Sequence, residues 1–382
     1  MKANRYLTLQ GSWRYRKLDN GTEFSSVILQ RRFCLKGMAP ELIEGVLSRL
    51  KKGVAAEEAH IELAHKIGSN PETVNQLIML LMKNNVILEI PAEELTPQDK
   101  GLYDRQILFY NLYETQQISG TDLNSQLQKR KVVIVGLGGY GTWMLLHLAR
   151  IGIRHIVGID PDVVELTNLN RQVLYKQSDI GSMKIDACRR SIAEIDPDIY
   201  FEGHAVHIHS PQDLIQYLDG ADLVFNAFGY CPTDMPQFLP TRHVAQACID
   251  KQIPSLLYNG SWVGPLHVPG VSACYWCLMS IPEIAEAARA SIPESIDRRR
   301  ALPAFAPRVA MAANIAAWEA SRFLSKTERP PSMDHLITFD TFSYQSSKLI
   351  RVPKRDDCPV CCGKPNILSE SIRGMTEFGI ND

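Results

Sequence analysis

The stretch KVVIVGLGGYGTWMLL, residues 131–146, decides the fold of this chain. It begins as an apolar run typical of a buried strand, passes through a glycine-rich turn, and continues as a helix-like segment. Gly136, Gly138 and Gly141 satisfy the pattern G-x-G-x-x-G between strand and helix. Such a turn binds phosphate groups at a helix start, so we predict a nucleotide site. The glycines alone fit the pyrophosphate of NAD and the triphosphate of ATP equally well.

The segments that follow this turn alternate between strand and helix. The predicted strands are KVVIV, HIVGID, IYFEGHAV and ADLVFNAF, and the predicted helices cover 141–151, 181–195 and 210–219. This alternation favours an α/β fold with a Rossmann-like, doubly wound and mostly parallel sheet. Further strands are expected in SLLYNGSWVGPLHV and in the pair LITFDTF and SSKLIRV near the C-terminus.

Residues 1–95 are predicted to form a separate winged-helix-like domain, and residues 96–382 the nucleotide-binding domain. The turn Asp19-Asn20-Gly21 indicates a hairpin. Three helical stretches and the strand VILEI follow, and Asn70 with Pro71 marks the start of the third helix. That helix lacks the basic character of a DNA-reading helix. We therefore expect this domain to recognise a peptide, because an edge strand beside a helix can bind an extended chain.

Bulk composition excludes several classes of partner. The chain has 382 residues and a formal net charge of -1, so we expect no nucleic-acid partner. No apolar segment is long enough to cross a bilayer, and the N-terminus lacks the apolar region of a signal peptide. We expect a cytoplasmic protein with reduced thiols and no membrane partner.

Charged residues beyond the glycine turn distinguish between the two nucleotides. Asp160 ends the second predicted strand, where an acidic side chain binds the ribose of NAD or ATP. Arg171 follows that strand, and Lys184 begins the next predicted helix. Taken alone, Arg171 could equally form an ion pair on the surface, and Lys184 could equally be a solvated helix residue. Together they favour ATP, because attack on the α-phosphate builds negative charge that cations stabilise.

The motifs GLGGYG, D-x-D at 160–162, NLNRQ at 168–172 and G-x-x-K at 181–184 resemble those of the ThiF/MoeB/HesA superfamily. The resemblance covers roughly residues 100–365 and implies adenylation of a carboxylate by MgATP. It implies nucleotide-binding roles for Gly136, Gly138, Gly139, Gly141, Asp160, Asn168, Arg171, Gln172 and Lys184. It also implies catalytic roles for Arg171, Lys184 and Arg105, the last within LYDRQI and reaching a partner's site across a homodimer.

One position departs from the family pattern. After a strand such as ADLVF the family carries D-x-x-D, whose second aspartate holds magnesium. Here Asn226 takes the first place and Gly229 the second. Asp234 is a candidate substitute, whereas Asp222 is less well placed. The missing aspartate leaves open a non-catalytic scaffold that presents a peptide to another protein.

Two C-x-x-C pairs predict a structural zinc site. They are Cys274 with Cys277 and Cys358 with Cys361, and four thiolates suit tetrahedral zinc. Cys362 competes with Cys361 for the fourth position, and the spacing favours Cys361. The resemblance implies the same site, placed away from the nucleotide.

Other reactive side chains receive no catalytic assignment. Cys188 is predicted to be a small buried side chain, and Cys231 is expected in a loop beside the site. Neither is assigned as a nucleophile. His207 and His209 alternate along a predicted strand and are interpreted as ordinary strand residues.

The resemblance extends to the peptide-modifying branch of the superfamily. It implies that a ribosomally made precursor peptide is the substrate in natural-product biosynthesis, with glutamate side chains activated for dehydration and cyclisation. The run Arg298-Arg299-Arg300 would attract such an acidic peptide, or is a solvated loop. Alanines 310, 313, 317 and 320 indicate close helix packing, at a dimer interface or in a core. The alternatives are a sulfur-carrier adenylyltransferase and an NAD-dependent oxidoreductase, although the latter leaves Arg171, Lys184 and the cysteines unexplained.

Overall fold

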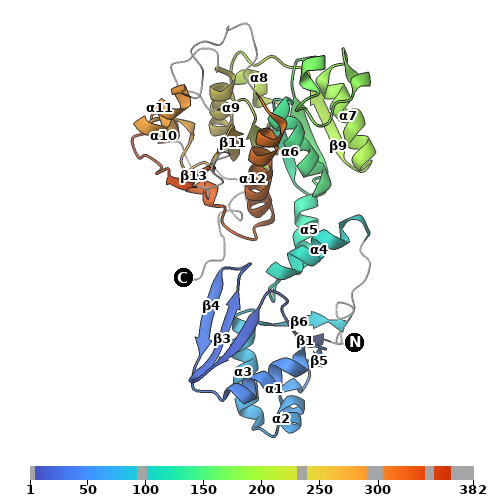
Figure 1. Ribbon diagram of the computed structural model, residues 1–382, viewed down its shortest axis with the longest axis vertical. Coiled ribbons are helices and arrows are strands. Elements are labelled where there is room, and N and C mark those ends of the chain that lie inside the picture. Colours follow the sequence, from blue (N-terminus) through green and yellow to red (C-terminus); the bar gives the residue numbers. More distant parts are fainter. Residues whose placement is uncertain (1–4, 93–100, 230–238, 291–303, 340–347, 363–382) are drawn as a thin grey trace. The chain divides into compact units, whose positions relative to one another are not determined.

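The computed structural model describes residues 5–92, 101–229, 239–290, 304–339 and 348–362. They form two compact units, residues 1–125 and 126–382, which run from blue to red in Figure 1. The boundary predicted at residue 95 marks the end of a peptide-recognition domain, whereas the boundary at residue 125 marks the end of a compact unit. The boundary at residue 95 stays a prediction. No helix among the described residues is both long and apolar enough to span a membrane.

The first unit combines two small sheets with four α-helices that lie wholly within it. One sheet has the order β5-β1-β6 and the other the order β2-β3-β4. The strands and helices are β1 (Arg5–Leu9), β2 (Arg14–Leu18), β3 (Gly21–Ser26), β4 (Arg31–Leu35), α1 (Pro40–Leu50), β5 (Val54–Ala55), α2 (Ala59–Ile67), α3 (Pro71–Lys83), β6 (Ile87–Pro91) and α4 (Asp104–Tyr110). Helix α5 (Gly120–Gln128) spans the boundary to the second unit.

Local signals in the sequence explain most of these elements. Leu18 pairs with Gly21 across the predicted hairpin turn. Asn70 caps α3, because its side chain accepts a hydrogen bond from the backbone N–H of Glu72 at 2.7 Å. Strand β1 was not predicted. It pairs with β6 and β5, so distant partners stabilise it rather than a local pattern.

The second unit is built around an eight-stranded sheet of order β14-β13-β12-β11-β10-β7-β8-β9. Pairings from β11 through β9 are parallel and those from β11 to β14 antiparallel. The strands are β7 (Lys131–Val135), β8 (His155–Ile159), β9 (Tyr200–His204), β10 (Leu223–Asn226), β11 (Ser255–Asn259), β12 (Trp262–His267), β13 (His335–Thr338) and β14 (Lys348–Arg351). The helices are α6 (Gly139–Arg150), α7 (Lys184–Ile195), α8 (Gln212–Ile215), α9 (Leu239–Asp250), α10 (Tyr275–Met279), α11 (Pro282–Ala290) and α12 (Ala306–Ser325).

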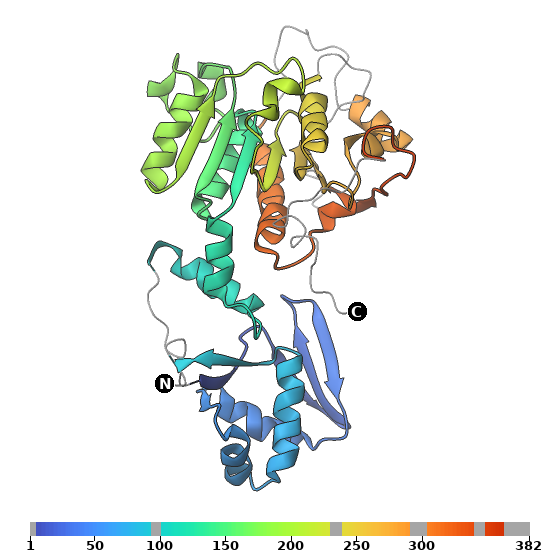
Figure 2. The ribbon, with the colours of Figure 1, turned by 180° about the vertical axis from the view of Figure 1, so that it is seen from behind.

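Helices cover both faces of this sheet. Helices α8 and α9 pack on one face, where Val133 and Val135 of β7 join their core. Helices α6, α7 and α12 cover the other face, and Figure 2 shows the strands from behind. The sheet mixes four parallel with three antiparallel pairings, so the predicted fold class is confirmed. Its parallel part brings the carboxyl ends of β7, β8, β9 and β10 to one edge, which is where such folds bind ligands.

Helix α12 packs along α6 within the same chain. Ala313, Ala317 and Ala320 are buried on α12, and Ala310 is partly buried. Three of the four alanines therefore serve the chain's own core, as in the second of the two interpretations offered above. The exposed face of α12 is instead formed by larger side chains.

Candidate nucleotide-binding site

The glycine turn joins β7 to α6 at the ligand-binding edge of the sheet. Gly136 has a φ of 94°, a conformation that favours glycine. A Cβ on Gly141 would lie 1.8 Å from the carbonyl oxygen of Gly136, so only glycine fits there. A Cβ on Gly139 would lie 3.3 Å from Val309 and 3.6 Å from Arg171. The turn is therefore tight, and its outer side faces Arg171 and the start of α12.

Asp160 and Lys184 meet beside this turn. Asp160 follows β8 and Lys184 is the first residue of α7, and both side chains are buried. Lys184 Nζ lies 3.4 Å from an Asp160 oxygen and 2.7 Å from Asp162 Oδ2. Burial raises the pKa of Asp160, although the charge of Lys184 opposes that shift. An ammonium group has three N–H donors, so Lys184 can contact a phosphate while it keeps both carboxylate partners.

Asp160 also fixes the backbone of the turn. Its Oδ2 accepts a hydrogen bond from the Leu137 N–H at 2.7 Å, and Tyr175 donates its hydroxyl proton to the Leu137 carbonyl at 2.8 Å. The peptide groups on either side of Leu137 are thus held by one side chain each. Cys188 Sγ lies 3.5 Å from the Tyr175 hydroxyl, and burial raises the pKa of this thiol to about 12. A thiol this well buried is a packing residue, which agrees with its lack of a nucleophile assignment.

The NLNRQ segment lies across from the turn. The Arg171 guanidinium donates to Thr167 O at 2.7 Å, and Asn168 accepts a hydrogen bond from the Glu165 N–H at 3.1 Å. Gln172 is buried, with its Nε2 4.0 Å from the position of a Cβ on Gly138. Its Oε1 is buried with no hydrogen-bond partner among the described residues. An unsatisfied amide at the turn fits a polar ligand there.

A pocket of about 410 Å³ opens at the ends of β8, β9 and β10. Asp160 and Asp162 line it together with His207, His209 and His243. Its volume is within the range of small-molecule sites. The interpretation of His207 and His209 as strand residues is wrong, because β9 ends at His204 and the chain beyond it borders the pocket. In the sequence, the alternate spacing of the two histidines indicated a continuing strand and gave no sign of a pocket.

The backbone at position 229 disfavours a carboxylate-bearing residue. Gly229 has a φ of 110°, and a Cβ there would lie 2.1 Å from the Asn259 side-chain nitrogen. Asn226 donates its amide proton to the Thr241 carbonyl at 2.9 Å, and Asp222 pairs with Arg130. At this point of the described chain the family's magnesium ligand has no replacement. Asp234, Cys231 and Arg298–Arg300 lie outside the described residues.

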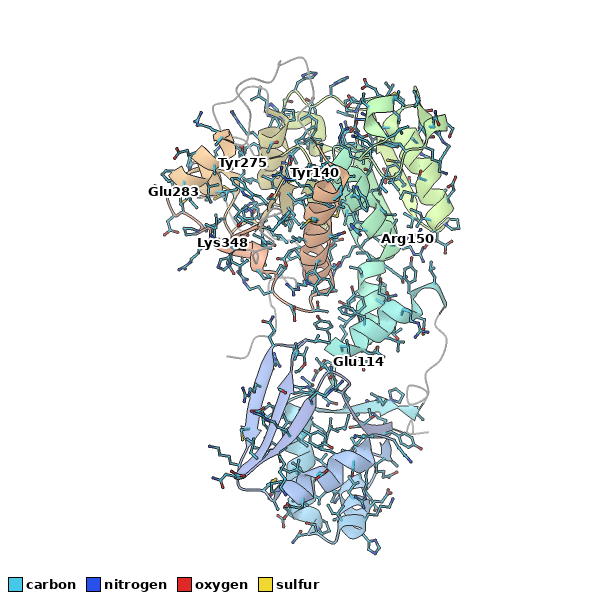
Figure 3. All side chains as sticks on the ribbon, in the orientation of Figure 1. Glu114, Tyr140, Arg150, Tyr275, Glu283 and Lys348 are labelled. Carbon is cyan, nitrogen blue, oxygen red and sulfur yellow. The ribbon has the colours of Figure 1, made fainter. Side chains whose placement is uncertain are left out.

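Three residues near the turn were missed by the sequence analysis. The Tyr140 hydroxyl, labelled in Figure 3, accepts a hydrogen bond from the Gly260 N–H at 2.8 Å. Arg308 donates to Ser261 Oγ at 3.2 Å in the same β11–β12 turn, and Asn259 fills the space beside Gly229. Tyr140 occupies one of the x positions of the G-x-G-x-x-G motif. Asn259 and Arg308 are distant in sequence, so no local pattern identified them.

Arg105 lies on α4 in the first unit. Its side chain is 91% exposed, and its nearest carboxylate is that of Asp104 at 3.9 Å. An exposed arginine is available to bind an anion, but no phosphate-binding group accompanies it on α4. Its role as a phosphate contact stays a prediction.

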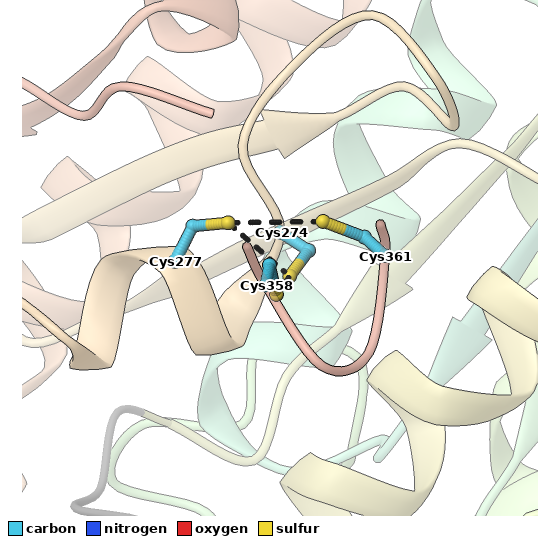
Figure 4. Close-up of side chains that lie close together, drawn as sticks. All are labelled: Cys274, Cys277, Cys358 and Cys361. Atoms are coloured by element: carbon cyan, nitrogen blue, oxygen red, sulfur yellow. Dashed lines mark hydrogen bonds between the residues drawn. The ribbon is translucent and has the colours of Figure 1, made fainter. Parts of the chain in front are cut away.

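The four predicted metal-binding cysteines converge. Their sulfur atoms all lie within 4.8 Å of one another, and Cys274 Sγ is 3.7 Å from the sulfurs of both Cys277 and Cys358 (Figure 4). Zinc bound tetrahedrally at about 2.3 Å separates its thiolates by roughly 3.8 Å. The cluster therefore fits zinc. Cys362 points elsewhere, toward the Asp356 carbonyl, which agrees with the choice of Cys361.

A family model described as the ThiF family matches residues 103–360. The chain belongs to the ThiF family. Among curated relatives, "Adenylyltransferase and sulfurtransferase uba4" of Aspergillus terreus is 25% identical over 262 residues, 66% of this chain and 52% of the relative. The chain thus spans about half the length of that ThiF-family relative.

Two solved structures share the fold of this ThiF-family chain. A crystal structure of E. coli MccB with AMPCPP and MccA has a TM-score of 0.71 and 22% identity, covering 93% of this chain and 99% of MccB. A crystal structure of PaaA has a TM-score of 0.60 and 23% identity, covering 74% of this chain and 92% of PaaA. The recognition of the superfamily from its motifs is confirmed, and the fold extends the likeness to MccB and PaaA.

Tyr175→Phe tests whether the clamp on Leu137 shapes the site. Losing one hydrogen bond to a buried carbonyl is expected to weaken ATP binding about three- to tenfold. Titration calorimetry with ATP measures this effect. Tyr200→Phe removes a hydroxyl from an exposed ring and is the control. Equal ATP affinity in Tyr175→Phe and the wild type contradicts the clamp.

Metal analysis by mass spectrometry tests the cysteine cluster. The purified chain is expected to hold about one zinc ion, because four thiolates satisfy its coordination. Cys358→Ser is expected to lose the metal and to lower the unfolding temperature. Cys362→Ser should keep both at the wild-type level. Zinc retained in Cys358→Ser, or lost in Cys362→Ser, refutes the ligand set.

Proposed function

We propose that this protein activates a carboxylate of a ribosomally made precursor peptide with ATP, as a step in natural-product biosynthesis. The observation that carries the proposal is the buried Asp160–Lys184 pair beside a tight glycine turn. Similarity of fold to MccB, whose crystal structure holds AMPCPP and MccA, supports it. The carboxylate oxygen would attack the α-phosphorus, and pyrophosphate would leave.

The chain's own residues have separable roles in this proposal. Asp160 accepts hydrogen bonds from ribose hydroxyls, and the turn directs the N-terminus of α6 toward the phosphates. Arg171 and Lys184 stabilise the charge that develops on the α-phosphate. The first unit would bind the peptide, and glutamate side chains are the proposed acceptors of AMP. An internal nucleophile of the peptide would then attack the activated acyl carbon and AMP would leave, which closes a ring with net loss of water from the peptide.

Magnesium is proposed to enter with ATP. When bound, the ion neutralises phosphate charge. The described residues offer no carboxylate at position 229, so no step is assigned to a protein-bound magnesium. Arg171 lies beside the glycine turn, and Lys184 lies beside the Asp160 carboxylate.

A sulfur-carrier adenylyltransferase is the second candidate. The curated relative named as an adenylyltransferase and sulfurtransferase favours it. This function predicts activity on a small protein that ends in Gly-Gly, with residues 1–95 dispensable. The peptide-modifying function predicts activity on a short peptide, and predicts that deletion of residues 1–95 abolishes it.

The substrate test uses short peptides encoded beside this gene, synthesised and incubated with the protein and MgATP. Mass spectrometry is expected to detect added AMP or loss of water. Lys184→Ala and Asp160→Ala should each lower peptide-dependent ATP consumption at least about 100-fold, because they remove charge stabilisation and ribose binding. Lys348→Ala, on the exposed strand β14, is the control. Wild-type turnover in Lys184→Ala refutes the assignment of this site.

We propose, in addition, that two copies associate through the exposed face of α12. Met311 and Trp318, seven positions apart, share one side of this helix and are 38% and 43% exposed. Light scattering after gel filtration is expected to give a dimer mass for the wild type and a monomer mass for Trp318→Glu. Val27→Glu introduces the same charge at an exposed apolar residue of the first unit and should stay dimeric. A monomeric wild type contradicts the proposal.

A further inference from the structure

Three hydrogen-bond donors meet at the turn between β11 and β12, beside the glycine turn. Tyr140 lies in the first turn of α6, Asn259 ends β11, and Arg308 lies in the first turn of α12. The Gly260 N–H donates to the Tyr140 hydroxyl at 2.8 Å, and Arg308 Nη2 lies 3.8 Å from the position of a Cβ on Gly260. Three elements that are distant in sequence therefore bring polar side chains to one short stretch of backbone.

Each of these side chains keeps protons that no described residue accepts. The Tyr140 hydroxyl accepts the Gly260 N–H and donates to no group in the described chain. Arg308 donates to the Ser261 hydroxyl at 3.2 Å and has no carboxylate partner among the described residues. The Asn259 side chain forms no hydrogen bond within the described ranges. A hydroxyl, an amide and a guanidinium that all offer protons match an anion and not a cation.

Buried contacts hold Tyr140 in place. The Tyr258 hydroxyl donates to the Tyr140 carbonyl at 3.1 Å, and the two rings pack edge-on at 6.1 Å. Tyr258 itself is fully buried on β11. Burial also raises the pKa of Tyr140, so its hydroxyl keeps the proton that it would donate. The first turn of α6 is thus fixed to β11, and the donors are positioned before any ligand binds.

The donor cluster adjoins the end of α6 that favours anions. The position of a Cβ on Gly139 lies 3.3 Å from Val309, the neighbour of Arg308, and 3.6 Å from Arg171. Cations therefore flank the N-terminus of α6, whose N–H groups attract phosphate. In the sheet, β8 lies on one side of β7 and β11 on the other. A nucleotide with its ribose at Asp160 would extend its phosphates across the turn toward this cluster.

We propose that Tyr140, Asn259 and Arg308 form an anion site that binds the terminal phosphates of ATP directly and holds pyrophosphate as it leaves. The inference rests on the proposed function, because it takes the nucleotide to be ATP. The Asn259 amide occupies the space that a side chain at position 229 would need, so the chain offers a donor there. A carboxylate reaches a phosphate only through a cation, whereas N–H and O–H groups bind it directly.

The number of donors favours pyrophosphate over the carboxylate of the substrate. In an in-line displacement the attacking carboxylate and the leaving pyrophosphate lie on opposite sides of the α-phosphorus, so one cluster serves one of them. A single guanidinium satisfies both oxygens of a carboxylate. The further protons of Tyr140 and Asn259 match the larger set of oxygens on a pyrophosphate group.

Titration calorimetry of the full chain with ATP and with AMP isolates the contribution of the terminal phosphates. Arg308→Gln is expected to weaken ATP binding about tenfold or more and to leave AMP binding unchanged, which also shows that the variant is folded. Arg308→Lys should recover part of the ATP affinity. Arg351→Gln, on the exposed strand β14, is the matched control. Equal ATP affinity in Arg308→Gln and the wild type, or an equal loss for AMP, overturns the proposal.

Two further titrations test the identity of the anion and the directness of the contact. Inorganic pyrophosphate without nucleotide should bind the wild type, and it should bind Tyr140→Phe about three- to tenfold more weakly. The loss of ATP affinity in Arg308→Gln should be the same with magnesium and with EDTA, because no metal mediates the contact. A wild type that does not bind pyrophosphate, or a loss confined to magnesium, contradicts the site.

Kinetics of peptide modification distinguish this site from a site for the substrate carboxylate. Arg308→Gln should raise the KM for ATP and leave the KM for the peptide unchanged. The opposite result assigns the cluster to the carboxylate and overturns the proposal. If no peptide is modified while Arg308→Gln still weakens the binding of ATP and pyrophosphate, the proposed function is refuted and the anion site stands.

Discussion

The hydrogen bond from the Leu137 N–H to the buried carboxylate of Asp160 is the contact on which the site depends. It ties the first peptide group of the glycine turn to the end of the neighbouring strand. Tyr175 holds the following peptide group from the other side. With both groups fixed, α6 begins where its backbone N–H groups face the open edge of the sheet. The turn has no room for side chains, since a Cβ on Gly141 would overlap the backbone of Gly136.

Asp160 serves several partners at once. It accepts hydrogen bonds from two backbone N–H groups, those of Leu137 and Asp162, and it lies within 3.4 Å of Lys184. Burial disfavours its charge, whereas these partners stabilise the ionised form. A nucleotide that enters the pocket therefore meets a carboxylate already fixed in position. Lys184 is shared between Asp160 and Asp162, and its ammonium has a third N–H donor for a phosphate.

The sequence predicted those parts of the fold that depend on local chemistry. The hairpin at Asp19-Asn20, the cap at Asn70 and the strand-turn-helix at Gly136 follow from residues within a few positions of one another. The candidate site could be predicted from local sequence only in part. Asp160 and Lys184 were identified by position along the chain, but their contact depends on the pairing of β8 with β7. Asn259 ends β11, Arg308 lies in the first turn of α12, and the pocket histidines follow β9 or lie on α9. Only the assembled sheet and its helices bring these residues to the site.

The structure gives a physical reason for the glycine at position 229. In the sequence it is a missing aspartate. In the structure Gly229 adopts a positive φ, and the amide of Asn259 occupies the space that a side chain would need. The two positions are thus mutually adapted, and restoring an aspartate at 229 alone would strain the backbone. Glycine in place of the family's aspartate at position 229 removes a magnesium ligand and so affects how phosphate charge is neutralised. It leaves the glycine turn and Asp160 unaffected.

The most direct test of the account is which nucleotide binds beside Asp160. Titration calorimetry of the full chain compares ATP, supplied with magnesium, against NAD. The account predicts saturable ATP binding that Asp160→Ala lowers at least about tenfold, with no measurable binding of NAD. Binding of NAD without ATP, or ATP binding unaffected by Asp160→Ala, would contradict it.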